Sequence, residues 1–401
     1  MPEKRIVLKN CGVIDPKNIA TYLAADGLKA WQKARQMAPE KVIEEVKAAG
    51  LRGRGGAGFP CGLKWELARK SPGDEKYVIC NADEGEIGTF KDRYILENDP
   101  FTLIEGIAIA AYAVGAKQAF IYLRAEYHHL LDLLTSAVSQ SHEQGLEVNI
   151  EIREGAGAYV CGEESALMES IEGGRGEARY KPPFPPNRGL WQKPTIINNV
   201  ETLMNIPRII LNGAGWFSQT GTEKSKGTKV FSVSGDVARP GVYELILGSP
   251  LRELVIDLAG AEKVKMVQIG GATGRIVPYT MIDTPLSFET ILGAGSIIVY
   301  DESRDTIDIV YRTLEFLAEE SCGKCSPCRE GTEAMAEILA RFDRGEGREK
   351  DIKVLEELAR AMSISALCGL GQAAPTPVTD SLQYFREDYA KRIKQGGKVR
   401  C

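Results

Sequence analysis

The sequence predicts an α/β protein in three parts: an open Rossmann-like sheet domain, a small β-grasp roll and a four-helix bundle. Three observations predict this order. Short apolar strands alternate with helical patterns between residues 39 and 171, which is typical of a parallel sheet. After a stretch rich in Gly, Thr, Ser and Lys at 221–227, strands and one helix follow. From residue 306 onward the pattern is helical, which favours a bundle.

The periodicity of apolar residues places the elements of the first part. Helical spacing predicts a helix over 39–50, before a glycine-rich segment at 51–60. Beyond it, strands and helices are expected in alternation at 77–80, 101–115, 119–123, 126–145, 148–152 and 163–171. A proline cluster at 181–186 suggests a loop that clamps something bound.

The remaining elements define two further domains. We expect domains over 1–222, 228–304 and 305–401. The middle domain is predicted to hold strands and one helix at 229–234, 242–247, 251–259 (the helix), 266–269 and 297–300. The last is predicted to hold four helices, at 306–319, 329–343, 349–361 and 378–394.

Composition excludes some classes of function. The chain has 401 residues and a net charge of −5, which argues against nucleic acid or an anionic membrane as partner. No apolar run reaches the roughly 18 residues that a membrane span needs, and the first residues lack a hydrophobic signal region. We therefore expect a cytoplasmic protein that reaches a membrane only through a partner.

The cysteines near the end of the chain indicate a metal cluster. Cys322, Cys325 and Cys328 form C-x-x-C-x-x-C, and Cys368 follows in Leu-Cys-Gly-Leu-Gly. Three thiolates on one loop and a distant fourth suit an iron–sulfur cube. Structural zinc, the alternative, more often uses two separated C-x-x-C pairs. Nine cysteines, an odd number, argue against a disulfide framework. We predict one cluster that moves single electrons, and we expect that Cys11, Cys80, Cys161 and Cys401 are not among its ligands.

The glycine-rich segment matches the sequence of a dinucleotide-binding motif but not the structural context that the motif requires. Gly53, Gly55 and Gly58 fit G-x-G-x-x-G, but a helix precedes them where the fingerprint requires a strand. The ordinary Rossmann NAD site is therefore rejected. Small residues still let the backbone approach a flat ligand or a phosphate, and Arg54 and Lys64 add positive charge. The alternative is a tight structural turn.

Polar side chains gather after the strand predicted at 77–80: Asn81, Asp83, Glu84 and Glu86. Ligands bind at the carboxyl ends of strands in open α/β sheets, so these groups are candidates for a site; an exposed charged loop is the alternative. A second glycine-rich turn carries Gly162, Glu163 and Glu164 before the helix at 163–171. Glu163 also has a structural explanation, because acidic side chains favour helix N-termini.

Seven segments stand in one order: RGRGGAGFP, CNADEGE, GAYVCGEE, KPPFP, INNVET, CGKCSPCR and SALCGLG. Together they resemble the NADH-oxidising flavoprotein subunit of respiratory complex I and its relatives in NAD-linked hydrogenases and formate dehydrogenases. The resemblance runs from about residue 39 to about 392, and the opening residues favour the hydrogenase-type group. It implies FMN in the first domain, a ubiquitin-like middle domain and a helical bundle that carries one 4Fe–4S cluster.

The resemblance also implies a role for each candidate residue. The loop along FMN and NADH is Gly53, Arg54, Gly55, Gly56, Ala57 and Gly58. The residues expected to hold the FMN phosphate and ribityl side are Lys64, Asn198 and Asn199. The flavin ring region takes Asn81, Asp83 and Glu84, with Glu84 tuning the flavin and Gly162 and Glu163 nearby. NADH is expected to stack on Phe59 and Phe184 and to bond Lys181, Glu164 and, through the adenosine ribose, Glu86. Cys61 and Leu67 depart from the complex I pattern, which puts stacking on that side in doubt.

The implied function is an NADH dehydrogenase module. NADH gives a hydride to FMN, and single electrons pass through the 4Fe–4S cluster to partner subunits of a hydrogenase, a formate dehydrogenase or a complex I-like assembly. Hydrogenase-linked relatives often carry thioredoxin-like 2Fe–2S and ferredoxin domains, which we do not expect in this chain. We therefore expect a thioredoxin-like 2Fe–2S subunit and an iron–sulfur-rich catalytic subunit as partners. The alternative is a non-enzymatic electron-transfer or scaffold subunit with a degenerate flavin site.

Overall fold

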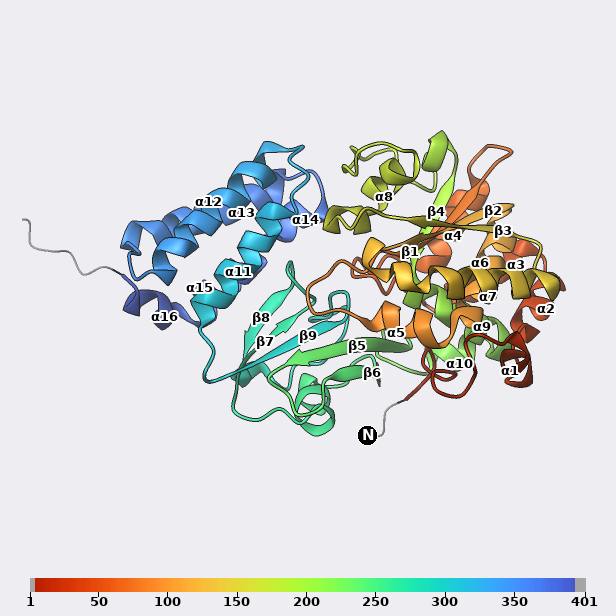
Figure 1. Ribbon diagram of the computed structural model, residues 1–401, viewed down its shortest axis with the longest axis horizontal. Coiled ribbons are helices and arrows are strands. Elements are labelled where there is room, and N and C mark those ends of the chain that lie inside the picture. The colour runs from red at the N-terminus through yellow and green to blue at the C-terminus, as the bar shows by residue number, and fades with distance from the viewer. Residues whose placement is uncertain (1–3, 394–401) are drawn as a thin grey trace, which may run out of the picture.

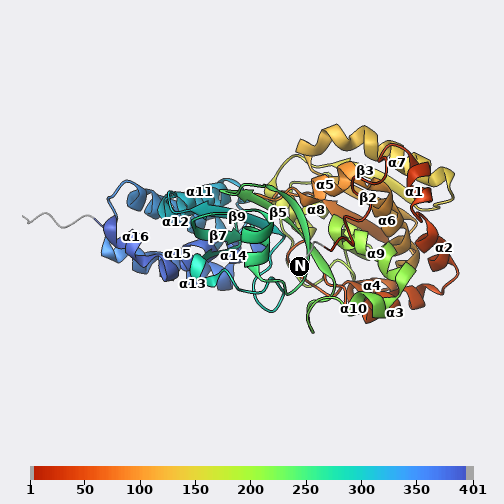
Figure 2. The same cartoon turned by 90° about the horizontal axis from the view of Figure 1, so that it is seen from below.

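The computed structural model describes residues 4–393 and divides into three regions along its long axis (Figures 1 and 2). A helix-flanked sheet lies at one end and a helical region at the other, with a second sheet between them. Cys401 and residue 394, the predicted end of the last helix, lie outside the described residues.

The first sheet confirms the predicted parallel arrangement. Its strands are β1 (Tyr77–Ala82), β2 (Gln118–Leu123), β3 (Asn149–Glu154) and β4 (Thr195–Asn199), all parallel in the order β3-β2-β1-β4. Sequence reasoning missed β4. Because the strands are parallel, their carboxyl ends meet at one edge of the sheet, where β1 ends in the predicted polar cluster.

Helices pack around this sheet, with α6 (Pro100–Val114) at the centre. Fourteen of its fifteen residues are buried, which explains its nearly continuous apolar sequence. The other helices of this domain are α1 (Ile19–Ala24), α2 (Lys29–Arg35), α3 (Pro39–Ala48), α4 (Cys61–Lys70), α5 (Lys91–Asn98), α7 (Leu131–Glu143), α8 (Glu164–Ile171), α9 (Val200–Asn212), α10 (Ala214–Ser218) and the short 3-10 turns η1 (Ala125–Leu130), η2 (Tyr159–Gly162) and η3 (Leu190–Gln192).

The single helix expected over 126–145 is wrong in its first turns. The chain forms η1 before α7, and Tyr127 departs from helical backbone angles within η1. Its hydroxyl donates to the buried carboxylate of Glu84, 2.9 Å away. This long-range contact offers a reason for the break that the local sequence does not contain.

The second sheet is mixed. Its strands are β5 (Thr228–Gly235), β6 (Gly241–Ile246), β7 (Val264–Ile269), β8 (Arg275–Pro278) and β9 (Ser296–Asp301), in the order β6-β5-β9-β7-β8. Only β5 and β9 pair in parallel. The prediction omitted β8. The helix expected at 251–259 is wound as a π-helix over η4 (Glu253–Leu258), and a 3-10 turn, η5 (Tyr279–Met281), follows β8.

The helical region contains more elements than the four expected. These are α11 (Thr306–Glu319), α12 (Ser326–Asp343), α13 (Glu349–Ser365), α14 (Gly369–Ala373), α15 (Thr376–Tyr384) and α16 (Arg386–Lys391). The single helix predicted at 378–394 is wrong, because the backbone leaves helical geometry at Phe385 between α15 and α16.

The start of the chain crosses from the first domain to the second sheet. Backbone N–H groups of Ile6, Val7 and Leu8 donate to the carboxylate of Glu244 in β6, at 2.9–3.0 Å. Burial raises the pKa of Glu244 to about 7. The first domain and the middle sheet are therefore tied together at a buried carboxylate.

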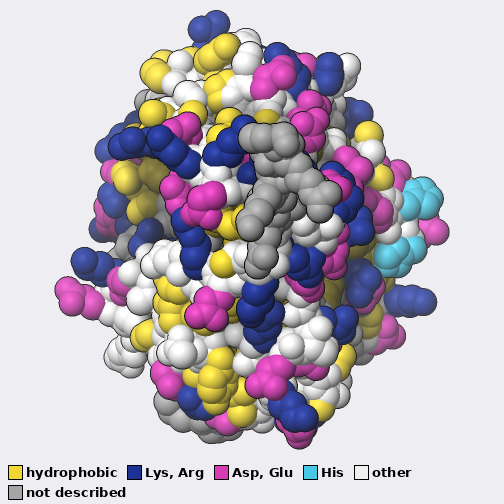
Figure 3. Space-filling model, turned by 90° about the vertical axis from the view of Figure 1, so that its left-hand side faces the viewer, with side chains coloured by type: hydrophobic (Ala, Val, Ile, Leu, Met, Phe, Trp, Pro, Cys, Tyr) yellow, Lys and Arg dark blue, Asp and Glu magenta, His cyan; other side chains and the backbone are white. Residues whose placement is uncertain are grey.

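Among residues 4–393, no helix is long and apolar enough to cross a membrane. On the face at the helical end, acidic and basic side chains are interspersed (Figure 3).

Candidate functional site

A cavity of about 410 Å³ lies at the carboxyl ends of the first sheet and gathers ten of the predicted site residues. These are Gly55, Gly56, Ala57, Asn81, Asp83, Glu84, Glu86, Gly162, Glu163 and Asn199. The amide of Asn81, at the end of β1, donates to the carbonyl of Gly162 at 2.9 Å. This bond joins the acidic strand end to the second glycine-rich turn.

Sequence reasoning missed about half of the lining. The first domain adds Gly85, Thr89, Lys91, Asp92, Tyr159 and Val160; the middle domain adds Gly270, Thr273, Gly274, Gly293 and Ala294; the helical region adds Gly369 and Leu370. The cavity is thus built by all three regions. No local sequence pattern predicts that the middle-domain glycines line the cavity, because only tertiary packing brings them to the carboxyl-end edge of the first sheet.

Nine predicted residues lie outside the lining: Gly53, Arg54, Gly58, Phe59, Lys64, Glu164, Lys181, Phe184 and Asn198. Arg54 is fully buried, and its guanidinium donates to the backbone carbonyls of Arg52, Lys226 and Thr228. Its side chain therefore fixes the glycine loop to the start of the middle domain. Asn198 accepts from the indole N–H of Trp65 at 2.9 Å.

A group of charged residues lies between α4, α8 and the proline cluster. The ammonium of Lys181 lies 2.7 Å from Glu163 and 3.0 Å from Glu164, and Lys64 lies 3.4 Å from Glu164. Burial acts to raise the pKa of Glu164, but the two lysines outweigh it and lower the pKa. Glu163 also accepts from the N–H groups that open α8, as its structural explanation predicted. Phe59 and Phe184 are 44% and 53% exposed, so both rings are open to a ligand.

Glu84 is fully occupied by the protein. One carboxylate oxygen accepts from the Thr89 hydroxyl and the Asp92 N–H, at 3.1 and 2.9 Å. The other accepts from the Arg93 N–H and the Tyr127 hydroxyl, at 3.0 and 2.9 Å. Burial raises the pKa of Glu84. This carboxylate therefore serves the N-terminus of α5, where its charge is favourable.

Asp83, in contrast to Glu84, is not fully satisfied by hydrogen bonds from the protein. Its Oδ2 atom is buried and has no hydrogen-bond partner, and burial raises the pKa of the carboxyl to about 7. A buried acceptor without a donor is costly. Because Asp83 lines the cavity, a ligand with an N–H or O–H group would satisfy it. The glycines around it let such a ligand approach the backbone closely.

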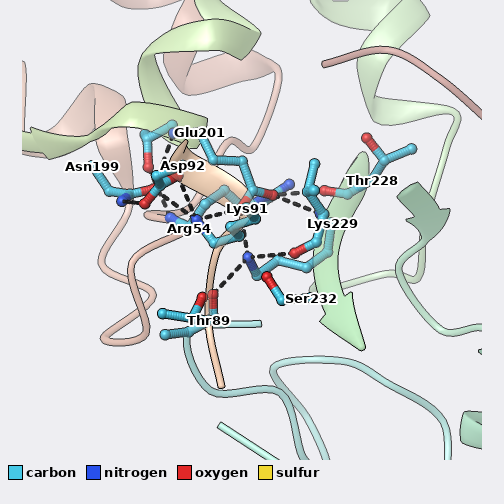
Figure 4. Close-up of polar contacts among 12 residues, drawn as sticks. Arg54, Thr89, Lys91, Asp92, Asn199, Glu201, Thr228, Lys229 and Ser232 are labelled. Atoms are coloured by element: carbon cyan, nitrogen blue, oxygen red, sulfur yellow. Dashed lines mark hydrogen bonds and ion pairs between the residues drawn. The ribbon is translucent and has the colours of Figure 1, made fainter. Parts of the chain in front are cut away.

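A buried ion-pair network supports the cavity wall between the first and middle domains (Figure 4). The ammonium of Lys91 lies 2.7 Å from Asp92 and 3.1 Å from Glu201, and that of Lys229 lies 2.5 Å from Glu201. Asn199 donates to Asp92 at 2.7 Å. Burial acts to raise the pKa of Glu201, but both lysines lower it. Because Lys229 also donates to the carbonyl of Ala294 at 3.0 Å, the network fixes a middle-domain turn at the cavity.

The four predicted cluster cysteines line a second, adjacent cavity. Burial, and then the nearby thiols, raise the pKa of Cys328 to about 11 although a bond from Ser321 opposes this. Among the described residues, no group of three or more His, Cys, Asp or Glu side chains is arranged to hold a single metal ion. A 4Fe–4S cube would spread its four thiolates over four irons. Val160 and Leu370 line both cavities.

Four further cysteines of the described residues are not part of this lining. Cys11, Cys61, Cys80 and Cys161 are buried and free, and burial raises the pKa of each thiol. His128 and His129 are exposed.

Sequence-family models match both halves of this site. Residues 46–208 match a family described as the Nuo51 FMN-binding domain, and residues 308–392 match the NADH-ubiquinone oxidoreductase-F iron–sulfur binding region. These matches confirm the predicted FMN domain and 4Fe–4S region.

Whole-chain comparisons agree. The chain is 43% identical to the NADP-reducing hydrogenase subunit HndC of Solidesulfovibrio fructosivorans, over 97% of this chain and 83% of that protein. It is 42% identical to a subunit of an NADH-quinone oxidoreductase of Rhizobium meliloti (strain 1021), over 97% and 98%. The crystal structure of an NAD⁺-reducing NiFe hydrogenase in the H₂-reduced state matches with a TM-score of 0.90 and 39% identity, over 98% of this chain and 68% of that one. The chain therefore belongs to the family of NADH-binding FMN and 4Fe–4S subunits that occur in complex I and in NAD-reducing hydrogenases.

Proposed function

We propose that this chain oxidises NADH at the three-domain cavity and delivers the electrons, through the four-cysteine cavity, to a partner subunit. The observation that carries this proposal is the shared wall: Val160 and Leu370 line both cavities. FMN, when bound, supplies the chemistry that takes a hydride and gives up electrons singly. The protein supplies position, burial and charge.

The residue roles that we propose follow the geometry. Asp83 accepts a hydrogen bond from the flavin ring, which satisfies its buried oxygen. Asn199, held by Asp92 at 2.7 Å, lies on the ribityl side, and Glu84 acts on the ring only through the end of α5. Phe59 and Phe184 stack on NADH, Lys181 and Glu164 bond it, and Lys64 serves the FMN phosphate side. The cluster ligands are Cys322, Cys325, Cys328 and Cys368.

Glu86 is proposed to accept from the adenosine ribose of the nucleotide. It lines the cavity and its carboxylate is buried. Acidic side chains at other nicotinamide sites bond the ribose 2′-hydroxyl and exclude a 2′-phosphate. NADH is therefore the expected substrate in preference to NADPH.

The finer architecture and the assembly are also part of the proposal. We take the mixed sheet as a ubiquitin-like β-grasp domain over 228–304 and the last region as a four-helix iron–sulfur bundle over 305–401. The two relatives above are subunits by name, which supports a multi-subunit parent. We propose a cytoplasmic chain that binds a thioredoxin-like 2Fe–2S subunit and an iron–sulfur-rich catalytic subunit.

Anaerobic addition of NADH to the purified chain tests the function. We expect the visible flavin absorbance to bleach and a reduced-cluster EPR signal to follow. A chain that holds a cluster but neither binds flavin nor responds to NADH would instead be the non-enzymatic electron-transfer or scaffold subunit.

A further inference from the structure

Both carboxylate oxygens of Glu86 are held in place by the protein. The hydroxyl of Tyr159, from the first domain, donates to Oε2 at 2.9 Å. The backbone N–H of Ala272, from the turn between β7 and β8, donates to Oε1 at 2.5 Å. Backbone hydrogen bonds from Thr273 and Ile87 also lower the pKa of Glu86 against its burial. The protein therefore supplies about as many donors as a carboxylate accepts, and it fixes the charge of Glu86 at the cavity wall.

The turn over residues 270–274 can approach Glu86 only because residue 271 has no side chain. Gly271 is buried and has a backbone φ of +84°, and a Cβ added there would overlap Glu86 Cγ. Gly270, Thr273 and Gly274 of the same turn line the cavity. The turn is therefore both a wall of the cavity and a support for its carboxylate.

We propose that this middle-domain glycine turn, defined as residues 270–274, is a specificity determinant of the nucleotide site. It fixes the Glu86 carboxylate at the cavity wall beside the adenosine ribose, where the charge repels a 2′-phosphate. The inference rests on the proposed function and deepens it, because it assigns nucleotide selection to a domain that carries none of the predicted site residues. Glu86 touches the ligand, and the turn is a positioning element that acts through Glu86.

Two glycine substitutions separate this role from backbone strain. Gly173 has the same φ of +84°, but a Cβ added there would meet nothing within 4 Å. Gly271→Ala and Gly173→Ala thus carry similar strain, and only the first displaces Glu86. The probes are ADP-ribose and its 2′-phosphate, which bind without hydride transfer, measured by equilibrium titration of the full chain with its flavin and cluster.

We expect the parent to prefer ADP-ribose over its 2′-phosphate. Gly271→Ala should reduce that preference at least tenfold, while Gly173→Ala should change it less than twofold, with flavin and EPR spectra retained in both. Unchanged preference in Gly271→Ala would overturn the inference while leaving the proposed function intact. A parent that binds neither probe would instead contradict the proposed function.

A double variant tests whether Gly271 acts through Glu86. Contacting residues show non-additive effects, so Gly271→Ala should change the preference less than twofold in a Glu86→Ala background. A further tenfold loss there would refute the assignment. If Gly271→Ala alone loses its cofactors, Glu86→Ala/Gly271→Ala should recover them, because the overlapping side chain is gone; failure of the double variant to do so would also count against it.

Discussion

Two cavities of nearly equal volume lie at opposite ends of the first sheet. The cavity at the carboxyl ends measures about 410 Å³ and is walled by all three regions. The cavity at the amino ends measures about 420 Å³ and is lined only by the first domain, including Tyr77, Gln118 and Trp191. Size therefore does not distinguish a cofactor site from a surface hollow in this molecule.

The chemistry of the two linings does distinguish them. The carboxyl-end cavity contains Asp83, with a buried oxygen that has no partner. The amino-end cavity is lined by a cluster of three aromatic side chains. The ring centroid of Trp191 lies 5.2 Å from that of Tyr77 and 5.7 Å from that of Phe120. Lys76 of this cavity already donates to the carbonyl of Ala68 at 2.8 Å. Among the described residues, no buried unpartnered side-chain atom belongs to this second lining.

The largest effect of a substitution is expected at the cavity lined by the four cluster cysteines. This cavity shares lining residues with the carboxyl-end cavity but not with the amino-end cavity. Cys368→Ala removes one of four ligands, so iron and sulfide should be lost or an oxygen-labile three-iron cluster should remain. FMN should stay bound, and reduction of ferricyanide by NADH should persist, since that acceptor takes electrons from reduced flavin. Iron analysis and EPR measure this. An intact four-iron signal would remove Cys368 from the ligand set.

Asp83 gives the carboxyl-end cavity a pH dependence in the acidic to neutral range. Its raised pKa, about 7 against 3.8, means that the folded state binds the proton more tightly than the unfolded state. The stability of the flavin-free protein should therefore fall as pH rises from about 4 to 7. Asp83→Asn should remove up to about 4 kcal/mol of that fall, because each tenfold difference in proton affinity between the two states corresponds to about 1.4 kcal/mol.

Denaturant unfolding of flavin-free parent and variant at pH 4 and pH 8 measures the Asp83 effect. Glu86 and Glu244, whose pKa values are also raised to about 7 by burial, should leave a residual dependence of the same sign in Asp83→Asn. An identical pH dependence in the two proteins would show that Asp83 is solvated in the flavin-free state.

Substitution of Glu84 is expected to lower the stability of the protein as well as to change the flavin reduction potential. Glu84→Gln replaces a carboxylate that accepts four hydrogen bonds, so unfolding free energy should drop by about 1–3 kcal/mol. The flavin potential should rise as the negative charge is lost. Thermal unfolding and spectroelectrochemical titration report the two effects. A stable variant with an altered potential would place the carboxylate at the ring itself.

The smallest effect is expected at the amino-end cavity. Trp191→Ala removes two aromatic contacts, each worth about 0.5–1.5 kcal/mol, from a residue that is 40% exposed. Stability should decrease by about 1–2 kcal/mol, while flavin content and bleaching by NADH stay unchanged. Flavin loss in this variant would break the contrast between the two cavities.

The sequence indicated the parts of the site that are local in the chain. The thiol spacing at 322–328 predicted a cluster region, and the polar residues after β1 lie at the cavity because parallel strands end at one edge. The middle-domain turn at 270–274 and the pair Lys91–Asp92 could not be predicted, since tertiary packing alone brings them there. Likewise, the bond from Tyr127 to Glu84, rather than any local pattern, accompanies the break before α7.

The central claim is that the flavin binds in the carboxyl-end cavity and not in the amino-end cavity of nearly equal volume. Gly162→Trp places an indole in the first cavity beside Asp83, whose carbonyl lies 3.4 Å from a Cβ at that position. Glu151→Trp places one in the second. FMN titration of the flavin-depleted chains, followed by fluorescence quenching, should show affinity at least a hundredfold weaker in Gly162→Trp and within twofold of the parent in Glu151→Trp. The reverse order would contradict the account.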